Sequence, residues 1–224
     1  TAIGWQMTDP RSVLSDLERD ALTELVNIGV SRAASSLRKM VGEQVLLSVP
    51  SVEVVSRATA TTLIRERESD QLVAVHQDFS GAFSGRAMLI FPASNSLSLV
   101  RAVTGDHLSE KDVAEIEDEA LAETGNIVLN GCLATMANML QRPLSMSLPE
   151  VVHAEGRDIF TVASLTSGDG VVLFLYINFA ISGRNIRGYI AMLMDLPSVE
   201  ALKSLIRDFI QRVIGSDGAA DMPV

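Results

Sequence analysis

Several features that define common protein classes are scarce in this sequence of 224 residues. It has one cysteine, Cys132, so no internal disulfide can form, which fits a reducing compartment. Aromatic residues make up only 4%, so a core must be mainly aliphatic. The longest apolar run, residues 171–177, is too short to span a bilayer, and residues 1–10 do not resemble a signal peptide. We therefore expect a soluble, cytoplasmic protein.

Basic residues are also fewer than acidic residues. The chain has 18 Lys and Arg against 28 Asp and Glu, a net charge of −10. A nucleic-acid binder needs a basic face for phosphates, and an anionic membrane attracts basic segments. We therefore expect neither nucleic acid nor membrane as a partner. The hydrophobic fraction of 47% is nevertheless ample for a folded domain.

Common hydrolase motifs are missing as well. The sequence contains no G-x-S-x-G, no Walker A loop and no H-E-x-x-H. The glycines of residues 79–86 are typical of a turn between strands rather than a phosphate cradle. Cys132 lies on the apolar side of a predicted helix, which favours a small core residue over a nucleophile.

The chain repeats itself when it is shifted by 99 residues. Glu24 then meets Glu123, and Asn27 meets Asn126. The match continues without a gap to residues 48–50, which meet 147–149. Internal repeats of this kind indicate a duplicated architecture. Later segments also correspond, namely 85–92 with 188–197 and the helical patterns 94–105 and 198–215.

The two halves are joined without a Pro-, Gly- or Ser-rich linker. We therefore expect a single domain over 13–214, made of repeats at about 13–105 and 112–214. Residues 1–12 are expected to be a poorly ordered lead, and 215–224 a disordered tail. Segments rich in Val, Ile, Phe and Thr predict strands. These are 44–57, 71–79, 83–91, 143–154, 158–166, 170–179 and 185–194.

Each half carries one helix with a narrow polar strip beside a wide apolar face. At 100° per residue, Asp20, Glu24 and Asn27 fall on the strip of the first helix. The strip of the second helix holds Glu119, Glu123, Asn126 and Asn130. Such strips are usually solvent faces. However, Asn is a poor helix former, and its recurrence at the same phase suggests a role beyond solvation.

The chemistry of these strips leaves several readings open. Glu can bind a cation on a partner, and Asn can orient a water because it carries both an acceptor and donors. Two carboxylates four residues apart also raise the possibility of a metal hydrolase. Metal clusters usually include His, however, and His76, His107 and His153 lie outside both helices. We therefore expect no metal or cofactor bound by the chain itself.

The two strips resemble the signature of the CheC/CheX/FliY family of chemotaxis phosphatases, Asp/Ser-x3-Glu-x2-Asn-x22-Pro. The first copy, from Asp20 to Pro50, matches in full. The second ends at Pro149 and departs only at Glu119, which stands for Asp or Ser. Both prolines are interpreted as architectural. Having two motifs, the chain looks most like CheC, and the resemblance covers roughly residues 14–210.

The resemblance implies both a fold and an activity. The fold would be α+β in two layers, a mostly antiparallel sheet with pseudo-two-fold symmetry and two long, exposed motif helices. The activity would be hydrolysis of the aspartyl phosphate of a CheY-type response regulator, which would supply the Mg²⁺. Glu24 or Glu123 would pair with the regulator's active-site Lys, while Asn27 or Asn126 would orient the attacking water. Asp20 and Glu119 would be supporting residues.

An alternative remains on the same fold. The chain could be a non-catalytic interaction protein that binds a response regulator, a CheD-like deamidase or the flagellar switch. Intact Glu and Asn pairs favour the phosphatase. A CheD-like protein remains a possible partner in either case.

Overall fold

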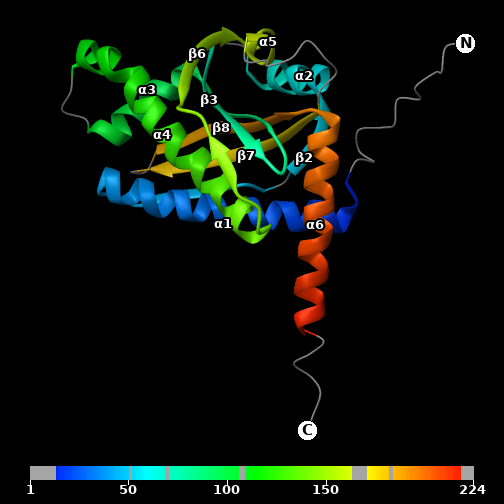
Figure 1. The fold of residues 1–224 in the computed structure, drawn as a ribbon. Helices are drawn as coiled ribbons and strands as arrows, with labels where there is room; N and C mark the ends of the chain where they lie inside the picture. The colour runs from blue at the N-terminus through cyan, green and yellow to red at the C-terminus, as the bar shows by residue number, and fades with distance from the viewer. Residues whose placement is uncertain are drawn as a thin grey trace, which may run out of the picture.

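The computed structural model describes residues 14–50, 52–68, 71–105, 109–162, 171–181 and 184–217. The expected lead, residues 1–12, lies outside the described residues. Six helices and eight strands lie within these ranges, arranged around one sheet (Figure 1). The helices are α1 Asp16–Val41, α2 Arg57–Arg67, α3 Ala93–Thr104, α4 Glu110–Met139, α5 Ile159–Val162 and α6 Leu196–Asp217. The strands are β1 Val45–Ser48, β2 Val52–Ser56, β3 Gln71–Gly81, β4 Gly85–Pro92, β5 Leu144–Met146, β6 Glu150–Glu155, β7 Val171–Ile181 and β8 Arg184–Met194.

All strand pairs of the sheet are antiparallel. The order is β1-β7-β8-β4-β3-β5, with β2 also pairing with β7 and β6 with β3. Two adjacent long hairpins, β3–β4 and β7–β8, form the centre through the β4–β8 pairing. The structure thus confirms the predicted mixed α/β fold with an antiparallel sheet.

The sheet buries side chains on both faces, because successive residues of a strand point in opposite directions. On β4, Leu89 and Phe91 enter the larger core with α1, α3, α4 and α6. Met88 and Ile90 enter a smaller core with α2 and α5. In Figure 1, α1 and α2 accordingly lie on opposite sides of the sheet. The larger core therefore supports the two motif helices.

The motif helices α1 and α4 begin with capping boxes. In α1, the Ser15 hydroxyl accepts a hydrogen bond from the Glu18 N–H, and the Glu18 carboxylate accepts one from the Ser15 N–H. Ser109 and Asp112 form the corresponding box of α4. Gly42 ends α1 at φ 78°, and its N–H donates to the Arg38 carbonyl.

The two motif helices cross at small residues (Figure 1). A Cβ atom on Gly29 of α1 would lie 2.7 Å from the Cα of Cys132 and 3.0 Å from the carbonyl oxygen of Gly131. Gly131 in turn faces Ala33. Because no side chain separates the backbones here, α4 lies directly against α1.

The predicted strands agree with the structure except at three places. The segment 158–166 was expected to be a strand, but Ile159–Val162 form the short helix α5, and 163–170 lie outside the described residues. Ile159 and Phe160 are buried in the smaller core, so helical burial of adjacent apolar residues overrides their strand propensity. The segment 44–57 divides into β1 and β2 around Val49 and Pro50. The segment 143–154 likewise divides into β5 and β6 around residues 147–149.

Two helical regions differ from expectation. Helix α2 was not predicted; Ser56 caps it, and it buries Ala60 and Ile64 in the smaller core. Helix α6 continues to Asp217, past the boundary expected at 214. It projects beyond the rest of the fold in Figure 1.

Candidate functional site

Asn27, in the middle of α1, is bonded to the chain between β1 and β2. Its Nδ2 donates to the carbonyl oxygen of Val49 at 2.9 Å, and its Oδ1 accepts from the Val49 N–H at 3.1 Å. Asn27 is half-buried, whereas Glu24 and Asp20 are exposed. The amide is therefore held in place, and the two carboxylates remain accessible on the same helix.

These bonds give a physical reason for the spacing between Asn27 and Pro50. A residue that precedes proline is confined to extended conformations. Val49 is that residue, and an extended Val49 presents its N–H and C=O to one side chain amide. Pro50 is exposed and bonds no candidate side chain, so its architectural interpretation agrees with the contacts.

Asn126 of α4 is held differently. Its Oδ1 accepts from Gln77 Nε2 at 3.1 Å and from Asn130 Nδ2 at 2.5 Å. Gln77 belongs to β3 and is buried, and its Nε2 also donates to the Ser147 carbonyl at 2.8 Å. The second amide therefore reaches the β5–β6 connection through a third side chain instead of directly.

The residues that precede the two prolines also differ in burial. Val49 is 2% exposed, whereas its sequence counterpart Leu148 is 84% exposed. The Asn126 side chain is bonded to Gln77 and Asn130 rather than to Leu148. The repeat seen in sequence therefore does not carry over to these contacts.

Each Asn lines its own open depression, and the two depressions share Arg32. The first has a volume of about 380 Å³ and is lined by Glu24, Asn27, Ile28, Ser31, Arg32 and Ser35. The second, of about 330 Å³, is lined by Arg32, Ala33, Ser36, Asn126, Ile127, Asn130 and Gly131. We call Glu24 with Asn27 the first site, and Glu123 with Asn126 the second site.

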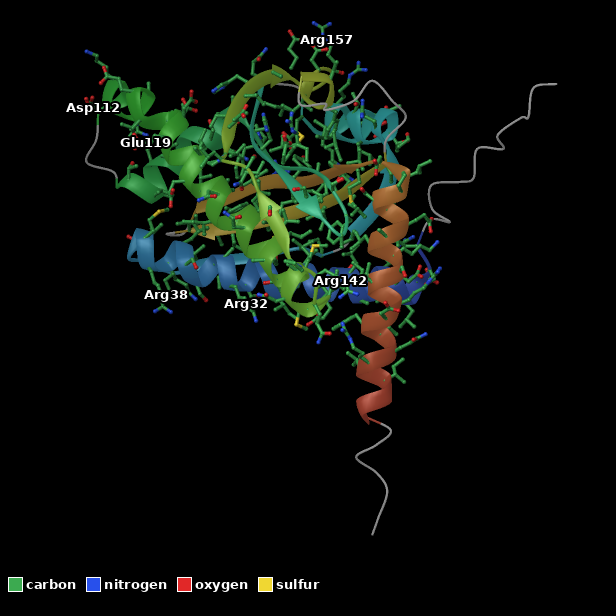
Figure 2. The ribbon with its side chains drawn as sticks, viewed as in Figure 1. Arg32, Arg38, Asp112, Glu119, Arg142 and Arg157 are labelled. Carbon is green, nitrogen blue, oxygen red and sulfur yellow. The ribbon has the colours of Figure 1, made fainter. Side chains whose placement is uncertain are left out.

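Arg32 brings a cation to the boundary between the two sites. Its side chain is on the side of α1 away from the sheet (Figure 2), and its Nη1 lies 3.4 Å from Thr135 Oγ1 on α4. A guanidinium here favours an anionic group on a docked partner. The motif pattern did not point to Arg32, because its sequence counterpart in the second half is Gly131.

The remaining predicted residues lie on the accessible surface of α4. Glu119 and Glu123 are exposed. Glu119 lies toward the N-terminal end of the helix (Figure 2). Asp20, Glu119 and Glu123 do not line either of the two depressions. The structure thus places Glu24 with Asn27 in one depression, whereas Asn126 lines the other depression without Glu123.

Cys132 is a packing residue at the helix crossing. It is fully buried, and burial raises the pKa of its thiol to about 12. A thiol that stays protonated is a poor nucleophile. The prediction of a small core residue is therefore confirmed.

Within the described residues there is neither a metal cluster nor a membrane-spanning helix. No group of three His, Cys, Asp or Glu side chains is placed to share a metal ion in that part of the chain. None of the described helices is long and apolar enough to cross a membrane. His153 lies beside α4, with its Nε2 2.9 Å from the Asp118 carboxylate.

The fold and the two strips define a class of protein: an antiparallel sheet that carries two crossed helices, each with a Glu-x-x-Asn pair. The solved structure of Thermotoga maritima FliY shares this fold, with a TM-score of 0.69 and 17% identity over 88% of this chain and 99% of that one. A family model, the CheC-like family, matches residues 17–54, which include the whole first motif.

Curated relatives point to the same family. The chain is 26% identical over 140 residues to the flagellar motor switch phosphatase FliY of Bacillus subtilis, covering 62% of this chain but only 36% of that protein. It is 23% identical over 141 residues to the CheY-P phosphatase CheC of the same organism, covering 62% of this chain and 67% of CheC. These matches confirm the resemblance to the CheC/CheX/FliY family.

Proposed function

We propose that this chain is a phosphatase that hydrolyses the aspartyl phosphate of a CheY-type response regulator. The first site carries the proposal: an accessible carboxylate and an immobilised amide, three residues apart, line one open depression. The name of the similar protein CheC, a CheY-P phosphatase, supports the choice of substrate.

The mechanism relies on positioning rather than on acid–base chemistry. Glu24 or Glu123 pairs with the regulator's active-site Lys and fixes the helix across the phosphorylated carboxylate. Asn27 or Asn126 then enters the regulator's site and orients the attacking water, much as a Gln does in GTPases. Mg²⁺ belongs to the regulator in this proposal. If positioning supplies about 10²-fold, the barrier falls by roughly 2.7 kcal/mol.

The fixed amide suits this role. A side chain that is already held loses little conformational entropy when a partner docks. Asn27 still has one N–H and one oxygen lone pair after bonding Val49. It can therefore contact a water without leaving its place.

One observation favours the non-catalytic alternative. The Val49 bonds give Asn27 a structural role that would retain it without any catalysis. The similar FliY is named both as a motor switch protein and as a phosphatase, so its name fits either reading. In this alternative the chain binds a regulator, a CheD-like protein or the flagellar switch.

A turnover measurement distinguishes the phosphatase from the non-catalytic interaction protein. A panel of purified regulators from the same genome is phosphorylated with a small phosphodonor and Mg²⁺, and the loss of phosphate is followed with and without the chain. We expect faster loss for the cognate regulator at substoichiometric amounts of the chain. Stoichiometric binding with an unchanged rate of loss would establish the interaction protein instead.

A further inference from the structure

Gln77 connects the second site to the sheet by a chain of side-chain amides. It is 1% exposed, and both hydrogens of its Nε2 are donated, one to the Ser147 carbonyl and one to Asn126 Oδ1. Its own Oε1 is buried without a hydrogen-bond partner among the described residues. Leaving an acceptor buried and unpaired costs free energy. Packing alone therefore does not explain a Gln at this position of the core.

The backbone fixes the direction of every amide in this chain. The Ser147 carbonyl can only accept, so Gln77 must turn its nitrogen toward it. The same nitrogen then requires an oxygen from Asn126, and that oxygen requires the nitrogen of Asn130. The orientation of Asn126 thus follows from one peptide group.

Both lone pairs of Asn126 Oδ1 are occupied in this arrangement. Its Nδ2 donates to no other described residue, so N–H groups are what Asn126 can offer to a partner. Asn27 differs, because the Val49 bonds leave it one lone pair and one N–H. The two sites therefore offer different chemistry despite having the same motif.

We propose that Gln77 is a positioning residue for the second site. It turns Asn126 so that the second site contacts the attacking water and the phosphoryl oxygens by N–H donation alone, whereas the first site can also accept a hydrogen bond from water. Donation to a charged phosphoryl oxygen gives a strong hydrogen bond and stabilises developing charge. The inference rests on the proposed phosphatase function.

The test removes one site at a time. With Asn27→Ala only the second site remains, and with Asn126→Ala only the first. We expect Gln77→Met to lower the rate of regulator dephosphorylation about tenfold in the Asn27→Ala background, as for a misplaced catalytic group. In the Asn126→Ala background that loss disappears. Equal losses in both backgrounds, or none in either, would overturn the proposal.

Gln71→Met is the matched control, since Gln71 lies exposed on the same strand. It should leave the rate in both backgrounds unchanged. If Gln77→Met does not fold, Asn130→Ala replaces it. This change removes the other donor to Asn126 Oδ1 and should alter the rate only where Asn126 is present.

Side-chain amide NMR separates this proposal from the phosphatase function. The Asn126 and Asn27 signals are identified by their loss in the Ala variants. Gln77→Met should shift the Asn126 signal and leave the Asn27 signal in place, whether or not the chain hydrolyses any phosphate. An unmoved Asn126 signal would show that Gln77 does not position it. A wild-type chain without turnover would instead remove the phosphatase proposal alone.

Discussion

Asn27 and Val49, which lie 22 positions apart in the chain, are joined by two hydrogen bonds, at 2.9 and 3.1 Å. The side chain amide satisfies both polar groups of one buried residue, as a neighbouring strand would. A residue that looks misplaced in a helix thus connects α1 to the β1–β2 connection. The bonds also orient the amide beside Glu24, so stability and the proposed catalysis depend on the same side chain.

The first prediction concerns stability. Asn27→Ala leaves the N–H and C=O of Val49 without these partners, so we expect the free energy of unfolding to fall by about 1–3 kcal/mol. Urea denaturation measures this loss. Ser31→Ala, at an exposed position one turn along the same helix, should change it by less than about 0.5 kcal/mol. Equal stability of the two variants would mean that the Val49 bonds contribute nothing.

The second prediction concerns docking. Glu24→Gln with Glu123→Gln removes the two charges proposed to pair with the regulator's Lys, so we expect a higher KM for the phosphorylated regulator. The effect should shrink as salt is added, because salt screens exposed charges. Glu43→Gln is the control, since Glu43 is exposed and lies after the end of α1. An unchanged KM would remove the proposed role of both carboxylates.

The third prediction concerns the helix crossing. Gly29→Ala places a methyl group 2.7 Å from the Cα of Cys132, which must force α1 and α4 apart. Overpacking of this kind costs about 1–3 kcal/mol. Thermal or urea unfolding should show the loss, and Ser36→Ala, at an exposed position of α1, should not. A fully stable Gly29→Ala variant would contradict the close approach.

The fourth prediction concerns acid sensitivity where α1 meets α6. Burial acts to raise the pKa of Glu18, but hydrogen bonds from the Ser15 N–H and the Arg207 guanidinium, 2.5 Å away, outweigh it and hold the pKa below its ordinary value. Glu18 therefore stabilises the fold fully above the ordinary value of 4.5, and this contribution is lost as the pH falls through the lower folded value.

Glu18→Gln should consequently weaken the fold at neutral pH and flatten the decline of stability below pH 4.5. Urea denaturation across this pH range measures both effects. Glu43→Gln again serves as the control with an exposed carboxylate. Parallel acid declines for wild type and Glu18→Gln would show that another group is responsible.

The fold class and the polar faces of the two motif helices could be predicted from the sequence. Apolar runs predict the long strands β3 and β7, and the two polar strips beside apolar faces predict both motif helices. The antiparallel order of the sheet was expected only from the family resemblance. Helix α5 was missed because its four residues are too few to show a helical period. Helix α2 was missed because few of its residues are buried.

The motif residues were identified from sequence, but their partners were not. Gln77 lies on a strand 49 positions before Asn126, and only the folded sheet brings the two together. Val49 carries no polar side chain, so no pattern could assign it a bond. The one available signal was the fixed spacing to proline, which points to the residue before it. Arg32 is matched by Gly131 in the other half, so the repeat did not point to it.

The rate of regulator dephosphorylation by the Asn27→Ala, Asn126→Ala double variant tests the central claim most directly. It is compared with wild type and with Asn138→Ala, an exposed Asn of α4, at a urea-free condition where circular dichroism shows all three folded. We predict spontaneous phosphate loss for the double variant and the wild-type rate for Asn138→Ala. A double variant that still accelerates the loss as wild type does would contradict the proposed catalytic role of both amides.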